Sequence, residues 1–139
     1  MNGDWERRSV GELMTRDPVV AGADMALADA AELMDFYRVS GLPVVDAAGC
    51  LVGVISQTDL LHARTTEALW HAWPGLAVRH LMTSPAVAVT ARTTIDDAAA
   101  LMERLHIHRL VVIGDDESAP IGLLSVTDLV RSMAERVPS

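Results

Sequence analysis

The chain has 139 residues, of which 50% are hydrophobic and 22% are charged, so its composition indicates one globular domain with a buried core. Its formal net charge of -8 argues against nucleic acids and anionic membranes as partners, because both bind basic protein surfaces. Cys50 is the only cysteine, which excludes an intrachain disulfide, and the lack of a signal peptide or a bilayer-length apolar run predicts a cytoplasmic protein.

The first half of the chain predicts a short strand, a helix, a hairpin and a second helix, in this order. A helix is expected at 27–34, because apolar residues recur there on one helical face, and Asp24 can cap its start. Two short apolar runs are typical of buried strands, and the turn between them makes a hairpin: 42–45 and 52–56. The second helix starts at Asp59 and is expected to continue through the connecting segment to Pro74-Gly75.

The second half repeats the first, block by block. The opening blocks are VGELMT at 10–15 and VRHLMT at 78–83, and the helix blocks are LADAAELM at 27–34 and IDDAAALM at 95–102. The hairpin blocks are LPVV at 42–45 with VGVISQTDL at 52–60, and LVVI at 110–113 with IGLLSVTDL at 121–129. Four matching blocks in the same order indicate two copies of one unit. Thr93 or Thr94 is the expected cap of the helix at 95–102.

These blocks predict an α/β (α+β) fold of two repeats, each a short strand, a helix, a β-hairpin and a helix. One repeat alone would leave an apolar side of its sheet open, so we expect the two repeats to pack about a pseudo-twofold axis. The expected segments are an N-terminal extension, the first repeat, a helical linker, the second repeat and a C-terminal tail: 1–9, 10–61, 62–77, 78–131 and 132–139.

The repeated blocks resemble the CBS domain family, and their tandem arrangement resembles the unit called a Bateman module, here expected as a free-standing member. The resemblance covers about residues 10–130 and rests on Met-Thr at the start of each repeat, the short apolar strand, and Gly-x-x-Ser-x-x-Asp at its end. It implies a cleft between the repeats that binds an adenosine compound: AMP, ADP, ATP or S-adenosylmethionine. It also implies a homodimer, and no cofactor is required.

The resemblance implies nucleotide-binding residues in both repeats. Asp59 and Asp128 would accept hydrogen bonds from ribose hydroxyls, and His108 with Arg109 matches a position that contacts phosphates. The hydroxyl groups of the same motifs would contact ribose or phosphate: Ser56, Thr58, Ser125 and Thr127. Residues that follow the Met-Thr blocks would hold the adenine: Val20, Ala21, Ala88 and Val89.

General chemistry supports these assignments, and one difference between the repeats ranks the two sites. A strand that enters a helix through Ser-x-Thr-Asp presents backbone N–H groups to an anion. A carboxylate can accept hydrogen bonds from both hydroxyls of a diol, and the planar guanidinium of arginine matches the oxygens of a phosphate. Ser40-Gly41 stands where the second repeat has His108-Arg109. In related modules the basic pair serves a ligand whose ribose lies on the other repeat's aspartate, so Asp59 is expected to hold the better site.

Other interpretations of these residues remain open. Asp59 and Asp128 could act only as helix caps. His106-x-His108 could bind a metal, although no third ligand is evident. Trp70 and Trp73 share a helical face and are expected in the core or at a subunit interface rather than against a ligand.

The sequence therefore predicts a sensor that binds an adenine nucleotide and passes a population shift to a regulated partner protein. An enzyme is not expected, because no nucleophile elbow, phosphate-binding lysine loop or metal triad is present, and the chain contains no lysine. The alternative is a protein-interaction adaptor that has this fold and no physiological nucleotide ligand.

Overall fold

The computed structural model describes residues 7–116 and 118–134 and forms two compact units. Val19–Ala86 is called the first-repeat unit here. The second-repeat unit combines the described residues of Met1–Pro18 and Val87–Ser139. The predicted extension at 1–9 and tail at 132–139 therefore lie partly outside the described residues.

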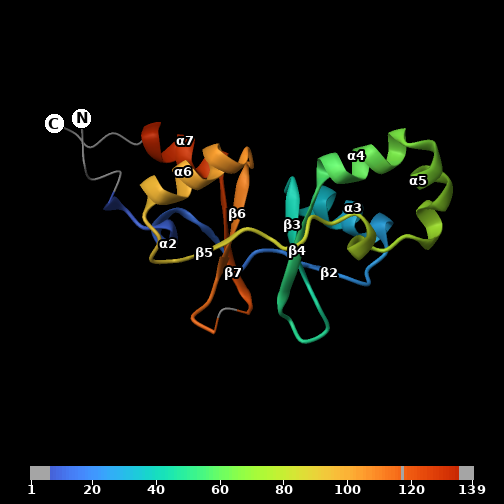
Figure 1. The fold of residues 1–139 in the computed structure, drawn as a ribbon, viewed down its shortest axis with the longest axis horizontal. Coiled ribbons are helices and arrows are strands. Elements are labelled where there is room, and N and C mark those ends of the chain that lie inside the picture. Colours follow the sequence, from blue (N-terminus) through green and yellow to red (C-terminus); the bar gives the residue numbers. More distant parts are fainter. Residues whose placement is uncertain (1–6, 117, 135–139) are drawn as a thin grey trace. The chain divides into compact units, whose positions relative to one another are not determined.

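The first-repeat unit contains a three-stranded sheet with helices on one side (Figure 1). Its strands are, in sheet order, β2 (Ala21–Gly22), β3 (Gly41–Val45) and β4 (Leu51–Ser56). Strand β3 runs parallel to β2 and antiparallel to β4. The helical segments are α3 (Leu27–Tyr37), α4 (Gln57–Thr65), α5 (Glu67–Ala72) and two 3-10 turns, Trp73–Gly75 and Val78–His80.

The second-repeat unit has the same arrangement with one strand added. Its sheet order is β1 (Thr15–Arg16), β7 (Pro120–Ser125), β6 (Arg109–Ile113) and β5 (Ala88–Thr90). Strand β6 runs parallel to β5 and antiparallel to β7, as β3 does with β2 and β4. Its helices are α2 (Val10–Leu13), α6 (Ile95–Leu105) and α7 (Val126–Ala134). The predicted mixed fold of strand, helix, hairpin and helix is confirmed in each repeat.

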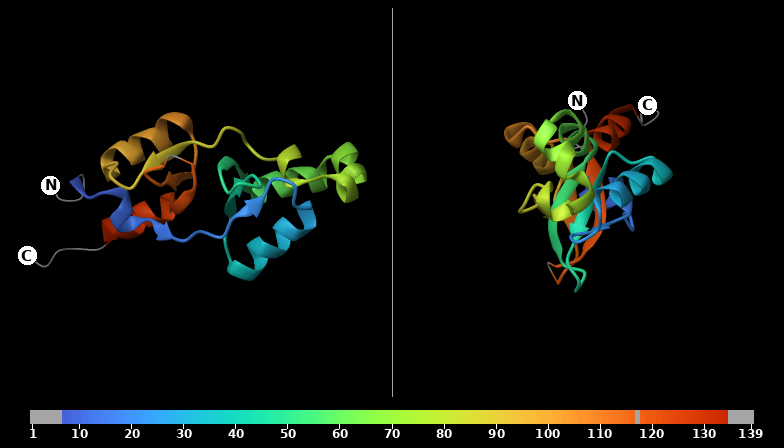
Figure 2. Two further views of the ribbon diagram at one scale, coloured as in Figure 1. Left: turned by 90° about the horizontal axis from the view of Figure 1, so that it is seen from below. Right: turned by 90° about the vertical axis from the view of Figure 1, so that its right-hand side faces the viewer.

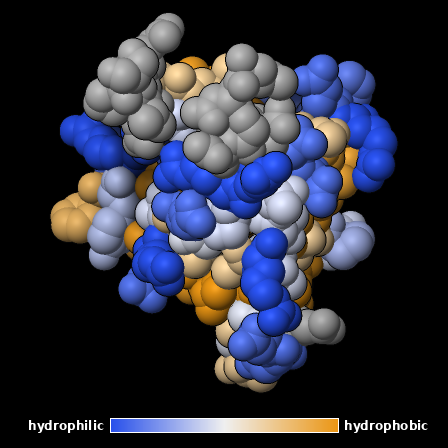
Figure 3. Space-filling model, turned by 90° about the vertical axis from the view of Figure 1, so that its left-hand side faces the viewer, coloured by the Kyte–Doolittle hydropathy of each residue, from blue (hydrophilic) through white to orange (hydrophobic). Residues whose placement is uncertain are grey.

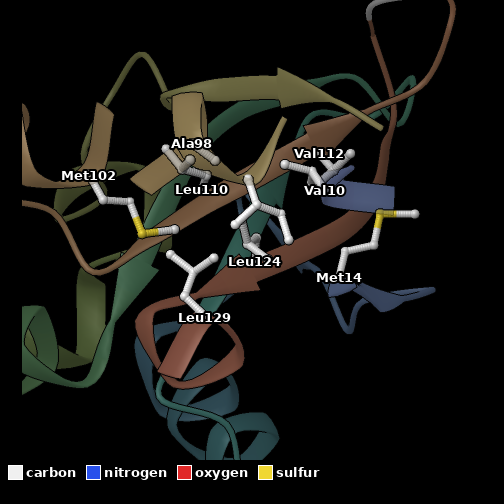
Figure 4. Close-up of a cluster of buried hydrophobic side chains, with 9 residues drawn as sticks. Val10, Met14, Ala98, Met102, Leu110, Val112, Leu124 and Leu129 are labelled. Atoms are coloured by element: carbon white, nitrogen blue, oxygen red, sulfur yellow. The ribbon is translucent and has the colours of Figure 1, made fainter. Parts of the chain in front are cut away.

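Each unit has its own hydrophobic core, built from equivalent residues of its helix and hairpin. In the second-repeat unit Leu124 lies at the centre of the cluster in Figure 4, with Met102 and Leu129 at one end and Val10 and Met14 at the other. The first-repeat core contains the matching helix and strand residues Leu27, Ala30, Met34, Leu42, Val44 and Ile55. The apolar periodicity read from the sequence therefore identifies the buried faces correctly.

The opening block of each repeat packs on the unit formed by the other repeat. Val10 is fully buried in the second-repeat core, and Thr15 pairs with Leu123 of β7. In the first-repeat unit, Thr83 forms an antiparallel bridge with Val54 of β4. The compact units therefore divide the chain differently from the repeats expected along the sequence.

The helix ends agree only in part with the sequence prediction. Thr94 caps α6, because its hydroxyl accepts a hydrogen bond from the Asp97 N–H at 3.2 Å. Asp24 is wrong as a cap: α3 starts without a side-chain cap, and Asp24 forms an ion pair with Arg79 instead. The expected continuous linker helix is interrupted at Thr66, whose backbone is extended, with φ -100° and ψ 114°.

Candidate functional site

Ser56 and Asp59 form a capping box at the start of α4. Asp59 Oδ2 accepts hydrogen bonds from the Ser56 backbone N–H at 2.8 Å and from the Ser56 hydroxyl at 3.0 Å. In return, the Asp59 N–H donates to Ser56 Oγ at 3.3 Å, and Thr58 Oγ1 lies 2.8 Å from the same oxygen. The capping role that the sequence left open is therefore present, and it fixes the orientation of the carboxylate.

Ser125 and Asp128 repeat this geometry at the start of α7. Asp128 Oδ2 accepts from the Ser125 N–H at 2.8 Å and the Ser125 hydroxyl at 3.0 Å, and the Asp128 N–H donates to Ser125 Oγ at 3.1 Å. Arg131, one turn further along the helix, adds a contact without an equivalent at α4: its Nη1 donates to Asp128 Oδ1 at 3.3 Å. Asp128 is buried, with 9% of its surface exposed.

The two carboxylates consequently differ in what they can offer a ligand. Asp59 Oδ1 has no hydrogen-bond partner within residues 7–116 and 118–134, and the residue is only partly buried. Its lone pairs can accept from a diol without displacing a protein contact. Asp128 Oδ1 already accepts from a guanidinium, so a ligand at Asp128 would compete with Arg131.

The helix starts offer fewer N–H donors than the sequence suggested. The first N–H of α4, on Gln57, donates to the Ser40 carbonyl at 2.9 Å, and the third donates to the serine of the capping box. The same pattern holds at α7, where the Val126 N–H donates to the His108 carbonyl at 2.9 Å. Hydroxyl groups are available beside these N–H groups, because Thr58 and Thr127 are both exposed.

The residues expected to hold adenine lie on edge strands or beside them. Ala21 is fully buried in the first-repeat core, so only its backbone could meet a ligand, whereas Val20 is half-buried. Ala88 and Val89 are half-buried in β5, and Val89 packs against the second-repeat core. Both β2 and β5 end their sheets in the described part of the chain, and an edge strand presents unpaired backbone groups to a ligand.

The second-repeat unit brings its basic pair to the start of α7. Arg109 lies opposite Ser125 in the pairing of β6 with β7, and the His108 carbonyl contacts the first residue of α7. At the equivalent position of the first-repeat unit, Gly41 lies opposite Ser56. The difference seen in the sequence is thus located beside the Ser-x-Thr-Asp motif, while a phosphate contact of Arg109 stays a prediction.

A groove of about 480 Å³ lies between α6 and α7 in the second-repeat unit. Met102, Leu129 and Met133 give it an apolar lining, and His106 and His108 also line it. No group of three histidine, cysteine or acidic side chains in the described part of the chain is arranged to hold a metal ion.

Trp70 and Trp73 contact each other, as their helical spacing predicts, with ring centroids 5.3 Å apart. Trp73 packs against the first-repeat core, whereas Trp70 is 42% exposed. The guanidinium of Arg64 lies 4.5 Å from the centre of the Trp70 ring and covers it. A core role is therefore confirmed for Trp73 alone.

Sequence reasoning missed two features of the structure. The contact from Arg131 to Asp128 could have been found from their spacing of three residues on a helix. The exposed aromatic pair Phe36 and Tyr37 at the end of α3 lies outside the apolar periodicity of that helix, and this departure was its only signal.

The surface of the described residues mixes polar and apolar side chains. Figure 3 shows a face on which hydrophilic residues predominate and hydrophobic patches lie between them. None of the helices described here is both long and apolar enough to cross a membrane.

Comparison with solved structures gives the same fold across most of the chain. The crystal structure of CBSX2 in complex with AMP aligns with a TM-score of 0.79, at 34% identity, over 91% of this chain and 96% of that chain. A structure of CBSX2 from Arabidopsis thaliana gives 0.78 at 33% identity, over 91% and 94%. The CBS domain pair of MJ0100, in complex with 5'-methylthioadenosine and S-adenosylmethionine, gives 0.79 at 22% identity, which speaks for the fold alone.

Sequence relatives agree with this assignment. Inosine-5'-monophosphate dehydrogenase of Bifidobacterium longum is 31% identical over 131 residues, which are 93% of this chain but 23% of that enzyme. The chain therefore spans less than a quarter of that relative's length. The uncharacterized protein MJ1426 of Methanocaldococcus jannaschii is 29% identical over 96% of this chain and 95% of its own length. The profile of the CBS domain matches residues 10–65 and 78–135, and the chain thus belongs to the CBS domain family as a tandem pair.

Proposed function

We propose that the chain is a regulatory module that binds an adenine nucleotide and catalyses no reaction. The observation that carries this proposal is the open Oδ1 of Asp59, held in place by the capping box at the start of α4. CBSX2, which is 34% identical to this chain, forms a complex with AMP, and this supports an adenosine ligand.

Asp59 would bind the ribose. Two ribose hydroxyls can donate to Oδ1 while Oδ2 keeps its bonds to Ser56, so ligand binding does not disturb the helix cap. Hydrogen bonds to a charged acceptor contribute about 1.5–3 kcal/mol each, enough to make this contact decisive for affinity. The exposed hydroxyl of Thr58 lies next to this site and would contact the ribose or a phosphate.

Asp128 would form the weaker site, because its Oδ1 is engaged with Arg131. This order agrees with the ranking expected from the sequence, which rested on different residues. AMP, ADP, ATP and S-adenosylmethionine are all candidates, and the ligand would act by shifting the population of the module's conformations toward one that a partner protein reads. The homodimer and the cytoplasmic location stay predictions from the sequence.

Thermal unfolding with AMP, ADP, ATP, S-adenosylmethionine and NADH tests this proposal. A ligand at a hundred times its dissociation constant stabilises the fold by about 2.7 kcal/mol, or on the order of 5 °C for a domain of this size. Asp59→Asn should remove most of the shift and leave only the response of the weaker Asp128 site, because its amide oxygen can keep the cap while its NH2 group replaces the acceptor with a donor. Asp128→Asn should have the smaller effect.

Thr94→Ala is the matched control for a lost helix cap. It removes the hydroxyl that caps α6 and should lower stability by about 1 kcal/mol without changing the ligand-induced shift. A well-folded wild-type protein that responds to none of the five compounds would contradict the proposal and favour the adaptor alternative. Equal responses of wild type and Asp59→Asn would move the site away from α4.

A further inference from the structure

Helix α3 carries two large aromatic side chains that do not enter the core. Phe36 is 78% exposed and Tyr37 is 50% exposed, and their rings contact edge to face with centroids 4.9 Å apart. The buried residues of the same helix are Leu27, Ala30 and Met34. In both views of Figure 2, α3 lies along the outside of its unit. The aromatic pair is therefore not part of the first-repeat core cluster.

The second repeat shows that the fold does not need this pair. Helix α6 has the same length as α3 and buries the equivalent residues, but Arg104 and Leu105 stand where α3 has Phe36 and Tyr37. Likewise, Ala100 stands at the position of Glu32. A contiguous exposed apolar patch rimmed by polar residues is typical of an interaction surface.

The aromatic pair borders a groove of about 650 Å³ on the first-repeat unit, called the α3 groove here. Its apolar side chains include Leu33, Phe36 and Tyr37, and its acidic side chains are Asp29, Glu32 and Asp35. Among the residues that the structure describes, no arginine or histidine lines it. Aromatic faces and carboxylates both attract arginine and lysine, while the apolar floor can hold one hydrophobic side chain.

Charge argues against a second copy of this chain as the symmetric occupant. If the twofold axis of a symmetric dimer passed through the α3 groove, its three carboxylates would face the same three carboxylates of the second copy. Like charges held together in an interface oppose association. A chain with a net charge of -8 is instead suited to attract a basic partner.

We propose that the α3 groove docks a short basic segment of another protein, in which arginine or lysine side chains flank a hydrophobic anchor. The anchor would pack on Leu33 and Phe36, one cation would lie over the aromatic pair, and the others would contact the acidic side chains. This partner surface lies outside the nucleotide-binding residues proposed above, and its occupation does not depend on them.

Fluorescence anisotropy with labelled peptides on the intact chain tests this proposal. The probes are KRLKRLKR and its variants with phenylalanine or tryptophan in place of leucine, and the controls are KRSKRSKR without an anchor and EDLEDLED with reversed charge. Binding should be saturable, should need both charge and anchor, and should weaken as salt rises. Phe36→Arg with Tyr37→Leu, which gives α3 the residues of α6, should weaken binding about tenfold or more.

Asp96→Asn with Glu103→Gln is the matched control, because it removes exposed carboxylates from α6 instead of α3. It should leave peptide binding unchanged, and the nucleotide response of both variants should equal that of wild type, which separates this proposal from the previous one. The proposal is overturned if no anchored basic peptide binds, or if the α3 variant binds as well as wild type. It is equally overturned if Phe36→Arg abolishes self-association instead, since the occupant would then be a second copy.

Discussion

Helices α3 and α6 occupy the same place in the two repeats, and their interiors match residue for residue. Both have their buried face at equivalent positions: Leu27, Ala30 and Met34 in one, Ile95, Ala98 and Met102 in the other. Both end in a residue with left-handed backbone, Arg38 at φ 57° and His106 at φ 54°. The buried residues of the two helices therefore match because both helices pack on their sheets in the same way.

At exposed positions the two repeats differ. Beside the Ser-x-Thr-Asp motifs, Gly41 in one repeat corresponds to Arg109 in the other, and His62 corresponds to Arg131. These changes leave the capping boxes intact and alter only the groups that a ligand could meet. Comparison of the two repeats thus separates what the fold requires from what distinguishes their functions.

The largest effect should come from the glycines on which the opening blocks pack. A Cβ at Gly53 would lie 2.7 Å from the Thr83 carbonyl oxygen and 2.8 Å from Met82 Sδ, so backbone has to move. At Gly122 the closest obstacle is the flexible side chain of Met14. We expect Gly53→Ala to lower the unfolding free energy by about 3 kcal/mol and Gly122→Ala by about 1 kcal/mol, measured by urea denaturation.

Gly22→Ala is the control for these substitutions, because a Cβ at Gly22 meets nothing within 4 Å. It should change stability by less than about 1 kcal/mol. Equal losses at Gly53 and Gly122 would show that the opening blocks of the two repeats pack equally tightly.

The next effect tests the exchange of the opening blocks between the units. Val10 is completely buried in the second-repeat core, and Val78 is equally buried in the first-repeat core. Val10→Ala should cost about 2 kcal/mol through the lost methyl groups and the cavity. Hydrogen exchange should become faster in β6 and β7, while Val78→Ala should affect β3 and β4.

Val130→Ala is the control, because Val130 is 57% exposed. It should change the free energy of unfolding by less than about 0.5 kcal/mol and leave the rates of hydrogen exchange as in wild type. If Val10→Ala instead accelerated exchange in β3 and β4, its side chain would belong to the core of its own repeat. That outcome would contradict the division of the chain into these two units.

The helices and strands of each repeat could be predicted from the sequence, because the spacing of apolar residues shows which face of a helix or strand is buried. Ala30, Met34 and their equivalents were identified in this way. The exchange of the opening blocks could not be predicted, since a short apolar block such as VGELMT shows that it is buried but not against which sheet. The structure reveals the partner, for example through the pairing of Thr15 with Leu123.

The candidate site also has some features that the sequence predicts and others that only the structure reveals. The motif placed Ser56 beside Asp59 because a capping box needs a spacing of three residues, and this spacing is visible in the sequence. The sequence does not show which oxygen of Asp59 joins the cap, because this depends on the orientation of the side chain. In the structure Oδ2 accepts the hydrogen bonds of the cap, which leaves Oδ1 for a ligand. Burial of Ala21 likewise follows from the packing of α3 on the sheet.

Apart from the control variants, the smallest effect on stability should come from Arg131→His, which gives the second repeat the residue of the first. The Arg131 side chain is 65% exposed, so loss of its ion pair with Asp128 should cost less than about 1 kcal/mol. Release of Asp128 Oδ1 restores an acceptor worth about 1 kcal/mol, which should tighten the weaker nucleotide site about fivefold. Isothermal titration calorimetry would detect this change as a second resolved binding event.

The reciprocal change, His62→Arg, should weaken the Asp59 site, because an arginine three residues after the aspartate can occupy Oδ1. The two substitutions together exchange one contact between repeats that otherwise share their capping boxes. If neither substitution alters nucleotide affinity, the open Oδ1 does not determine which site binds more tightly. The difference between Gly41 and Arg109 would then be the remaining explanation for unequal sites.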